Sequence, residues 1–469
     1  MIFKKHLTAS WLLRDLKEAI AGTDQDFTTG SLGRAIFLLS VPMVLEMMME
    51  SIFAVVDIFF VSRLGAGAVA TVGITESLMT IIYSIGGGLA TATTALVSRR
   101  IGEKHPEGAS VVAFQSILAG IGISLLIAIP GFIFARKILA LMGAEPEIAN
   151  SYSVFTQIML GGNIVITLLF IINSIFRSAG DAAISMRVLV LANLINMILD
   201  PLLIFGLGPL PALGIAGAAV ATTTGRGLAV IYQFYLLFNG KGRVKLSIEH
   251  LKFDFPVMKK LIRLAMGGMG QSLIATSSWV LLVRILANFG SAVVAGYTIA
   301  IRIVFFSLLP SFGISNATAT LVGQNLGSEK PDRAEKAAWV TGVINTILLG
   351  IIGVIFIIIP SYFISIFISQ EDVIYAGAEA LRIMSYGFLA YGFGMVMVNV
   401  LNGAGDTATP TKINFFCYWL LELPLAYLLA IPLNLREDGV FYSILIAETA
   451  MTAASLVIFR RGKWKGRKV

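Results

Sequence analysis

Twelve long apolar runs alternate with short polar segments along the chain. Most of these runs exceed the ~20 residues that a helix needs to cross a bilayer, so we expect tilted or bent spanning helices. Ten-residue segments of alternating apolar and polar residues, which a membrane β-barrel requires, do not occur in the sequence. The predicted spans are residues 35–62, 68–98, 109–135, 152–176, 184–206, 214–238, 257–288, 293–325, 337–360, 379–401, 411–433 and 440–459.

The composition agrees with this pattern. The chain is 57% apolar and 13% charged, whereas an average soluble domain is roughly 45–50% apolar and about 25% charged. A soluble core cannot bury this excess, because interior volume grows too slowly with chain length. We therefore predict an all-α integral membrane protein, and we exclude soluble enzymes and secreted disulfide-rich domains.

The positive charges are divided unevenly between the two sides of the predicted membrane domain. With the N-terminus inside, the inner segments hold 27 Lys and Arg residues and the outer loops hold five. Because positive residues accumulate on the cytoplasmic side, we expect a multi-pass protein of the plasma membrane with both termini in the cytoplasm. The net charge of +8 then comes from basic flanks that meet anionic lipid, and we expect no nucleic-acid partner.

The second half of the chain repeats the first at an offset of 225 residues. Six spans repeated as six spans enter the membrane in the same sense, so we predict two parallel six-helix repeats with a central cavity between them. Such a chain is typical of transport by alternating access, and a passive duplicated scaffold is the alternative. The equivalent positions are Gly65 and Gly290, segments 88–97 and 313–322, and the Ala-Gly-Asp turns 179–181 and 404–406.

The repeat and the polar segments together predict the domain organisation. A polar, basic linker separates the two six-helix lobes, and a basic tail follows the last span directly. The predicted parts are a cytoplasmic N-terminal segment at 1–33, the first lobe at 34–238, a cytoplasmic linker at 239–256, the second lobe at 257–459 and the tail at 460–469.

Seven acidic residues lie inside the predicted spans. An ionised carboxylate there costs about 2.5–3.5 kcal/mol or more. Each must therefore face a wet cavity, pair with a cation or hold a proton. These residues are Glu46, Glu50, Asp57, Glu76, Asp200, Glu422 and Glu448.

Two groups of polar residues share helix faces in the first half. Glu46, Glu50 and Asp57 point in one direction from the first span, and Asn196 and Asp200 share a face of the fifth. Asp57 and Asp200 lie at one depth, about 9–12 Å below the outer boundary. Two close carboxylates do not both ionise readily in a low dielectric, so we expect them to share or retain a proton. The alternative is two separately hydrogen-bonded carboxyls.

Pro42 removes a backbone hydrogen bond one turn before Glu46. The first helix can therefore bend where its acidic stripe begins, although a static kink is the alternative. Arg284 and Arg302, in the second half, either extend outward or neutralise a carboxylate.

Motifs of enzymes and cofactor sites are missing from the sequence. There is no P-loop, no H-E-x-x-H and no G-x-S-x-G motif, and the single Cys417 allows neither a disulfide framework nor a thiolate cluster. We expect no enzymatic activity, no metal site of the usual kind and no cofactor. Transport must then draw its energy from an ion gradient.

These residues together resemble the multidrug and toxic compound extrusion (MATE) family of antiporters, over essentially the whole chain. The resemblance is carried by Asp57 ahead of Gly65, by the Asn196-x-x-x-Asp200-Pro201 motif, by the repeated Ala-Gly-Asp turns and by the LPLAY run at 423–427. The chain is most similar to the damage-inducible (DinF-like) branch. In the sodium-coupled NorM-like branch the seventh helix carries an acid, whereas this chain has Gln271 there.

The resemblance implies two six-helix lobes arranged as a V. It also implies export of cationic or amphipathic small molecules by a monomer, in exchange for H⁺ or Na⁺. Ion and proton coupling, including a candidate Na⁺ site, is implied at Asp57, Asn196 and Asp200, and the bend of the first helix at Pro42.

The resemblance further implies substrate contacts at Glu50 and Asn173, to which we add Glu46 on the same stripe. The alternative function is a flippase for lipid-linked saccharide in the same superfamily. Such a protein needs a cationic cavity for pyrophosphate, whereas the four first-lobe acids predict an acidic one. The resemblance assigns no role to Glu76, Glu422 or Glu448.

Overall fold

The computed structural model describes residues 9–206, 211–240 and 242–469. Every regular element in these ranges is a helix, as predicted. We call helices α2 to α9 the N-lobe and helices α10 to α18 the C-lobe. The N-lobe helices are α2 (Leu32–Val61), α3 (Ala66–Gly102), α4 (Pro106–Leu141), α5 (Pro146–Ser151), α6 (Ser153–Gly161), α7 (Asn163–Ala179), α8 (Ala182–Phe205) and α9 (Ile215–Phe238), with a 3₁₀ turn η1 (Ser62–Leu64).

The C-lobe has the same order of long helices. The eleventh span of the chain, which belongs to the C-lobe, contains a π-helical stretch, η4, between two α-helical ends. The C-lobe elements are α10 (Phe255–Leu286), η3 (Ala287–Phe289), α11 (Ser291–Gly327), α12 (Pro331–Ile358), α13 (Pro360–Ser365), α14 (Glu371–Tyr386), α15 (Phe388–Gly403), α16 (Ala408–Asn414), η4 (Phe415–Glu422), α17 (Leu423–Ala430) and α18 (Arg436–Arg460).

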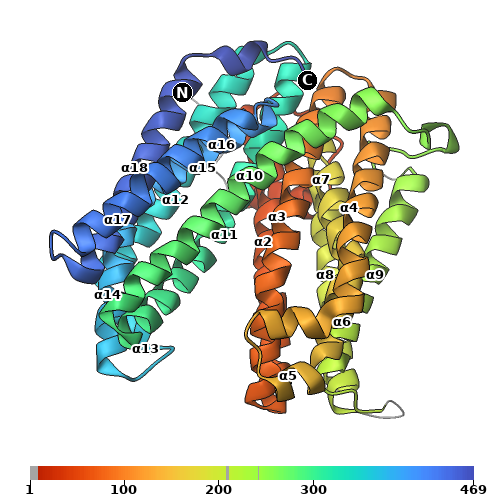
Figure 1. The fold of residues 1–469 in the computed structure, drawn as a ribbon. Coiled ribbons are helices and arrows are strands. Elements are labelled where there is room, and N and C mark those ends of the chain that lie inside the picture. The colour runs from red at the N-terminus through yellow and green to blue at the C-terminus, as the bar shows by residue number, and fades with distance from the viewer. Residues whose placement is uncertain (1–8, 207–210, 241) are drawn as a thin grey trace.

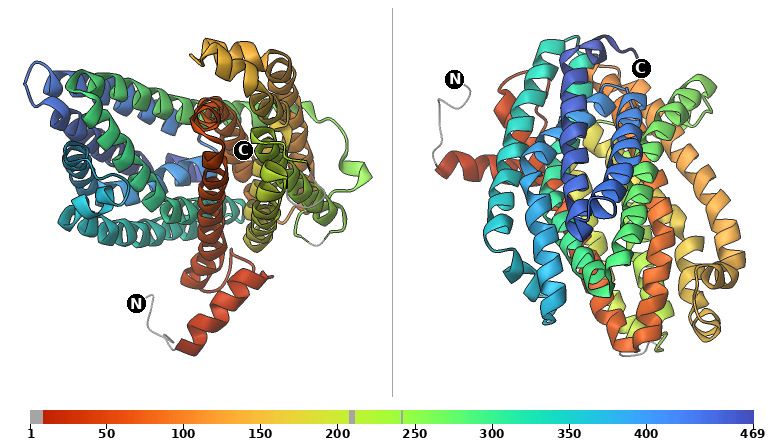
Figure 2. Two further views of the ribbon diagram at one scale, coloured as in Figure 1. Left: turned by 90° about the horizontal axis from the view of Figure 1, so that it is seen from below. Right: turned by 60° about the vertical axis from the view of Figure 1, so that its left-hand side comes forward.

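Three elements lie outside the two lobes. The short turns η2 (Ile248–His250) and η5 (Lys463–Gly466) belong to the linker and the C-terminal tail. Helix α1 (Ala9–Ala21) precedes the first span and extends sideways from the bundle (Figure 2). Glu18 of α1 forms a 2.5 Å ion pair with Arg34 at the start of α2. The sequence reading did not predict this helix.

The helices are long and apolar enough for a membrane. Within the described ranges, eight of them meet the requirements for a span, and the count rises to ten if each of two bent pairs is one span. The bent pairs are α6 with α7, at 40°, and α14 with α15, at 57°. Helices α2 and α9, of 30 and 24 residues, complete the predicted twelve.

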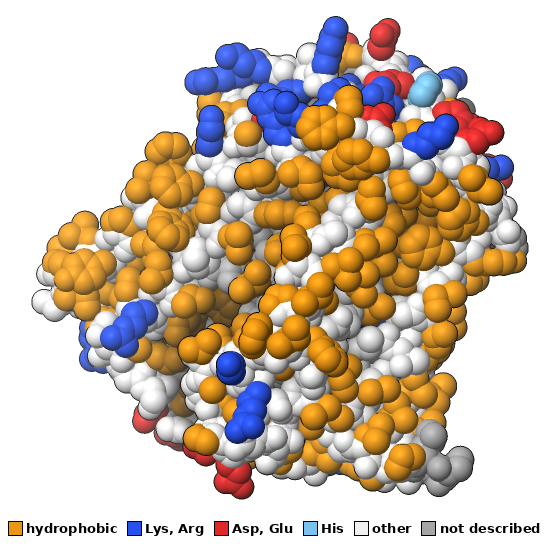
Figure 3. All heavy atoms as spheres, turned by 45° about the vertical axis from the view of Figure 1, so that its right-hand side comes forward, with side chains coloured by type: hydrophobic (Ala, Val, Ile, Leu, Met, Phe, Trp, Pro, Cys, Tyr) orange, Lys and Arg blue, Asp and Glu red, His pale blue; other side chains and the backbone are white. Residues whose placement is uncertain are grey.

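The two lobes meet at one end and diverge toward the other, which gives the molecule a V shape (Figure 1). The C-terminus and the start of the described chain lie at the end where the lobes meet. Lys and Arg side chains gather over this end, and apolar side chains cover the flank below it (Figure 3). The predicted two-lobe architecture is confirmed, and the V opens away from the basic end.

Glycines allow the two lobes to pack backbone to backbone at the closed end. A Cβ on Gly102 would lie 2.0 Å from the carbonyl oxygen of Gln324, and a Cβ on Gly327 would lie 2.3 Å from that of Arg99. Gly102 and Gly327 are 225 positions apart, and so are Arg99 and Gln324. The contact between α3 and α11 is therefore made twice, once by each repeat.

A second pair of contacts follows the same offset deeper in the interface. A Cβ on Gly88 would lie 2.6 Å from the backbone nitrogen of Met269, and a Cβ on Gly313 would lie 2.7 Å from that of Val44. Val44 and Met269 are again 225 positions apart. The sequence repeat is therefore present in the structure as pseudo-symmetric contacts between α3 and α10 and between α11 and α2.

A short segment at Thr23–Gly30, which we call the strap, crosses the closed end. Its carbonyl groups accept hydrogen bonds from Arg243 of the linker, at 3.0 Å from Thr23 and 2.8 Å from Gln25. Arg333 of α12 donates to the carbonyl of Gly30 at 3.0 Å. Burial opposes ionisation of Asp26 in the strap, but hydrogen bonds from Thr28 outweigh it and hold the pKa of this carboxyl below its usual value. The strap thus joins the N-lobe side to the C-lobe.

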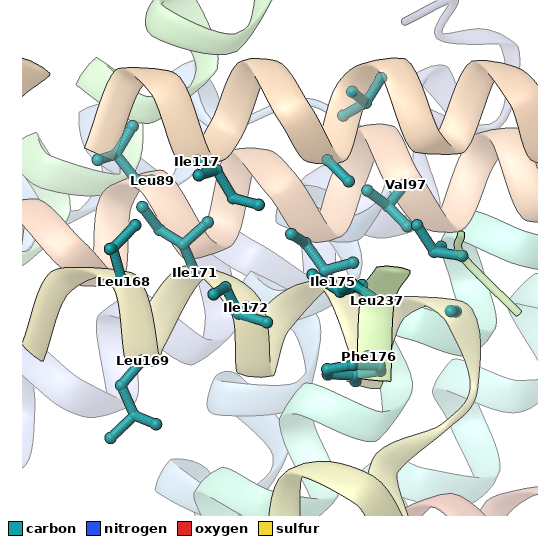
Figure 4. Packing of buried hydrophobic residues seen from close by; sticks show 14 of the residues in the cluster. Leu89, Val97, Ile117, Leu168, Leu169, Ile171, Ile172, Ile175, Phe176 and Leu237 are labelled. Carbon is teal, nitrogen blue, oxygen red and sulfur yellow. The ribbon is translucent and has the colours of Figure 1, made fainter. Parts of the chain in front are cut away.

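The N-lobe core is made of branched aliphatic side chains from several spans. Leu89 and Val97 of α3, Ile117 of α4 and Ile171 of α7 lie among its buried members, and Figure 4 shows Ile117 and Ile171 in the space between neighbouring helices. Because lipid surrounds the outside, this packing fixes the relative positions of the helices rather than hiding apolar surface from water. It holds the polar faces of α2, α7 and α8 in place.

Candidate functional site

A cavity of about 400 Å³ lies between the two lobes, where the arms of the V meet. Residues of α2, α3, α7, α10, α11 and α15 line it. Met47, Phe170 and Phe312 provide apolar and aromatic surface. Five amide side chains provide hydrogen-bonding groups that carry no charge, namely Asn173, Gln271, Asn316, Asn399 and Asn402.

Glu46 lies in the wall of this cavity and is only 1% exposed. It forms an ion pair with Arg177 near the end of α7, which also lines the cavity. An isolated carboxylate would be costly at this site, and the guanidinium compensates the charge directly. Glu46 and Arg177 therefore form an ion pair without net charge in the cavity wall.

The second predicted acid, Glu50, is paired in the same way. Arg226 of α9 is 4% exposed and donates to Glu50 at 2.9 Å. The Arg226 guanidinium also lies 4.6 Å from the ring centre of Phe53. Arg284 and Arg302, which the sequence offered as partners for carboxylates, are exposed and form no ion pair within the described part of the chain.

The prediction of a net acidic cavity is wrong for this reason. Of the four acids that supported it, only Glu46 and Glu50 line the cavity, and an arginine neutralises each of them. Asp57 and Asp200 lie outside its lining. Both arginines come from helices distant in sequence, so helix-by-helix reasoning could not place them beside the acids.

The three predicted coupling residues are assembled in the N-lobe between α2, α8 and α9. Asn196 and Asp200 are completely buried, and the Asn196 amide donates to Asp200 at 3.2 Å and to the Thr222 hydroxyl at 3.4 Å. Asp57, from α2, interacts with the same Thr222 side chain and lies near enough to Asp200 for their charges to interact. One oxygen each of Asp57 and Asp200 is buried without a hydrogen-bond partner.

The helices that carry this group are connected directly. Asn193, one turn before Asn196 on α8, donates to the carbonyl of Met49 on α2 at 2.7 Å. This bond holds the polar faces of the two helices together, so that Asp57 and Asp200 approach one another. The structure therefore brings together the two carboxylates whose common depth the sequence predicted.

Of the remaining predicted site residues, Asn173 lines the cavity and Pro42 does not. Asn173 is 5% exposed, lines the cavity and accepts a 2.6 Å hydrogen bond from Gln233 of α9. Pro42 lies inside the continuous helix α2. Two residues later, Val44 packs against Gly313 of α11, so the C-lobe touches the first helix beside its proline.

Four further N-lobe residues bind predicted site residues, although the sequence did not identify them as part of the site. Arg177 is one residue beyond the predicted fourth span, and Arg226 lies inside the sixth. Thr222 and Gln233 lie on the same helix as Arg226, at i−4 and i+7, and this polar spacing could have indicated a buried face. No group of three or more His, Cys, Asp and Glu side chains suited to a metal occurs among the described residues.

The fold and the site together define a multi-pass, all-helical membrane transporter rather than an enzyme. The MatE family model matches residues 42–202 and 269–428, once in each lobe and together over more than half of the chain. The chain belongs to the MatE family.

Proteins of known sequence and structure agree with this assignment. The chain is 24% identical to the probable multidrug resistance protein YoeA of Bacillus subtilis, over 94% of this chain and 96% of that protein. Its fold is similar to that of a MATE family multidrug resistance transporter in an outward-facing conformation, with a TM-score of 0.87, 23% identity and coverage of 96% and 98% of the two chains. A MOP superfamily transporter from Pyrococcus furiosus has a TM-score of 0.86 at the same identity and the same coverage.

Proposed function

We propose that the chain is a secondary active antiporter in which the Asp57–Asn196–Asp200 group couples substrate export to an ion gradient. The observation that carries this proposal is the environment of Asp200, which is completely buried, is close to a second carboxylate and forms no ion pair among the described residues. Two adjacent carboxylates, neither of which forms an ion pair within the described residues, bind a proton or a small cation readily.

The coupling ion we propose is H⁺. Each of the two carboxyl groups has one buried oxygen without a hydrogen-bond partner. A proton bound to that oxygen removes its negative charge and turns it into a hydrogen-bond donor. Sodium is the second candidate, because Asp57, Asn196 and Asp200 all offer oxygen ligands, which hard cations prefer. Experiment can distinguish the two ions, because a sodium gradient imposed at equal pH drives export only if sodium is the coupling ion.

The central cavity is the proposed substrate site. A volume of about 400 Å³ falls within the ~300–1,000 Å³ of typical small-molecule sites. Its aromatic and methionine surface fits an amphipathic molecule, and the amides can bind its polar groups. Glu50 is paired with Arg226, but its side chain is about one third exposed, so it is the acid of the cavity wall that a cationic group can approach most readily. We propose a monomer that exports such molecules and binds no nucleic acid.

The closed end of the V is proposed to face the cytoplasm. Lys and Arg gather there (Figure 3), and the positive-inside rule assigns such an end to the cytoplasmic side. Both termini would then be cytoplasmic in the plasma membrane, and the V would open outward. We propose that the two lobes, residues 34–238 and 257–459, move relative to one another as rigid bodies during alternating access.

Proteoliposome export of a fluorescent cation tests this function. A pH gradient and a sodium gradient are imposed separately, with matched cationic and anionic dyes. Export of the cationic dye under one gradient alone supports the antiporter and identifies the ion. Absence of export under either gradient, or preference for the anionic dye, contradicts the proposal.

A further inference from the structure

The C-lobe contains two buried carboxylates that the coupling group described above does not include. Glu422 ends the π-helical stretch η4 and is 4% exposed, and Glu448 lies in α18 and is 3% exposed. Neither forms an ion pair within the described ranges, whereas Glu46 and Glu50 of the N-lobe each have an arginine. A carboxylate inside the membrane domain without a cation must carry a proton or bind an ion.

The hydrogen bonds around Glu448 leave one of its oxygens without a partner. Its Oε1 atom accepts from the hydroxyl groups of Tyr391, at 2.7 Å, and Tyr418, at 2.8 Å. Its Oε2 atom is buried and has no hydrogen-bond partner. A bare carboxylate oxygen in such a place is strongly disfavoured, and a proton bound there would neutralise its charge.

Glu422 lies near enough to Glu448 for the two charges to interact. Its Oε2 atom accepts a 2.7 Å hydrogen bond from Ser278 of α10. The other titratable groups that interact with this pair are Tyr297, Tyr391, Cys417 and Tyr418, all neutral in their ordinary state. Among the described residues, the site therefore contains two acids, several hydroxyl donors and no basic side chain that would balance them.

We propose that Glu422 and Glu448 form a proton-binding site in the C-lobe, which holds at least one proton in this V-shaped arrangement of the lobes. The proton comes from solution and binds a carboxylate oxygen, so the charge of the pair changes from −2 to −1 without any other reactant. The site goes beyond the proposed coupling at Asp57 and Asp200, because it adds a second place, in the opposite lobe, where a proton can be carried.

Infrared absorption of protonated carboxyl groups tests the proposal on purified protein in lipid. The background carries Asp57→Asn and Asp200→Asn, so the N-lobe pair contributes no signal. In this background we expect a protonated-carboxyl band at neutral pH that Glu448→Gln or Glu422→Gln reduces. Glu379→Gln is the matched control, because Glu379 lies in the middle of α14 and already has a cation, Arg382, at 2.7 Å. It should leave the band unchanged.

The outcomes separate this proposal from the antiporter proposal, since the measurement requires no transport. A band of the same size in both Gln variants would overturn the C-lobe site. Removal of the band by sodium, but not by choline, would show a sodium site and also overturn the proton assignment. If a Gln variant does not fold, the protonated-carboxyl band is measured as a function of pH in the background protein instead. Absence of this band across the neutral pH range would exclude a bound proton and overturn the proposal.

Discussion

Glu46 of the N-lobe and Gln271 of the C-lobe occupy equivalent positions of the two repeats, 225 residues apart. Both line the central cavity. Glu46 binds Arg177 and Gln271 binds Asn402, and these two partners are themselves 225 positions apart. Glu46 and Arg177 form an ion pair, whereas Gln271 and Asn402 exchange two hydrogen bonds of 3.1 Å. One contact therefore exists in a charged and in a neutral form on the two sides of the cavity.

This pairing predicts that Arg177→Asn destabilises the protein, because it leaves Glu46 buried without its cation. Breaking a buried pair in this way costs about 3–5 kcal/mol. The double variant Glu46→Gln with Arg177→Asn copies the C-lobe pair and should recover most of the loss. Thermal unfolding of the wild type, both single variants and the double variant measures the coupling. Additive losses would show that the two side chains do not depend on each other.

Asp57→Asn and Asp200→Asn should each abolish gradient-driven export while leaving expression unchanged. Asparagine has nearly the shape of a protonated aspartate, so the variants should fold and insert. If the two acids bind one proton as a unit, the double variant should be little worse than either single variant. Proteoliposome export at matched protein content measures this, and full export by Asp57→Asn would refute the coupling role.

Pro42→Ala should restore one backbone hydrogen bond in α2 and reduce its ability to bend. We expect normal abundance and slower export, because the packing of α2 is kept while its change of shape becomes harder. Export rates at saturating substrate are the measurement. A rate equal to that of the wild type would make Pro42 a static feature of the helix.

Gly102→Ala should force the lobes apart at their closed end, because the added Cβ would lie 2.0 Å from the carbonyl oxygen of Gln324. Gly73→Ala is the control on the same helix, since no atom lies within 4 Å of its Cβ position. Spin labels at the exposed positions Glu103 and Glu329 report the separation of α3 and α11, in a background where Cys417 is replaced by Ala. We expect longer distances for Gly102→Ala alone, and equal distances in both variants would contradict the prediction.

The sequence predicted the architecture well because the bilayer leaves few solutions. A chain with long apolar runs must place them as helices, and a repeat of six spans orients both halves in the same sense. The offset of 225 residues reappears in the contacts of Gly102 and Gly327 at the lobe interface. The length of the runs predicted tilted or bent helices, but it did not predict the positions of the breaks, which are at Gly162 in the fourth span and Gly387 in the tenth. Nothing in these apolar runs marks the residue at which a span bends.

The site was predicted less completely, and the missing part has one physical cause. The periodicity of one helix places Glu46, Glu50 and Asp57 on a common face, and this needs no knowledge of other helices. The partner of each acid depends on which helix packs against that face. Arg177 and Arg226 could therefore be recognised as counter-charges only after the helices were assembled.

The strap and the tail also restrict the order in which the protein can be built. Arg333 binds the Gly30 carbonyl 303 positions earlier in the chain, and Arg99 donates to the carbonyl of Arg467, 368 positions later. During synthesis, the strap leaves the ribosome long before its C-lobe partner exists, and Arg99 is made 368 residues before the carbonyl group that it binds. These contacts of the closed end can therefore all be in place only after residue 467 has been made, and until their partners exist the inserted N-lobe exposes these polar groups without them.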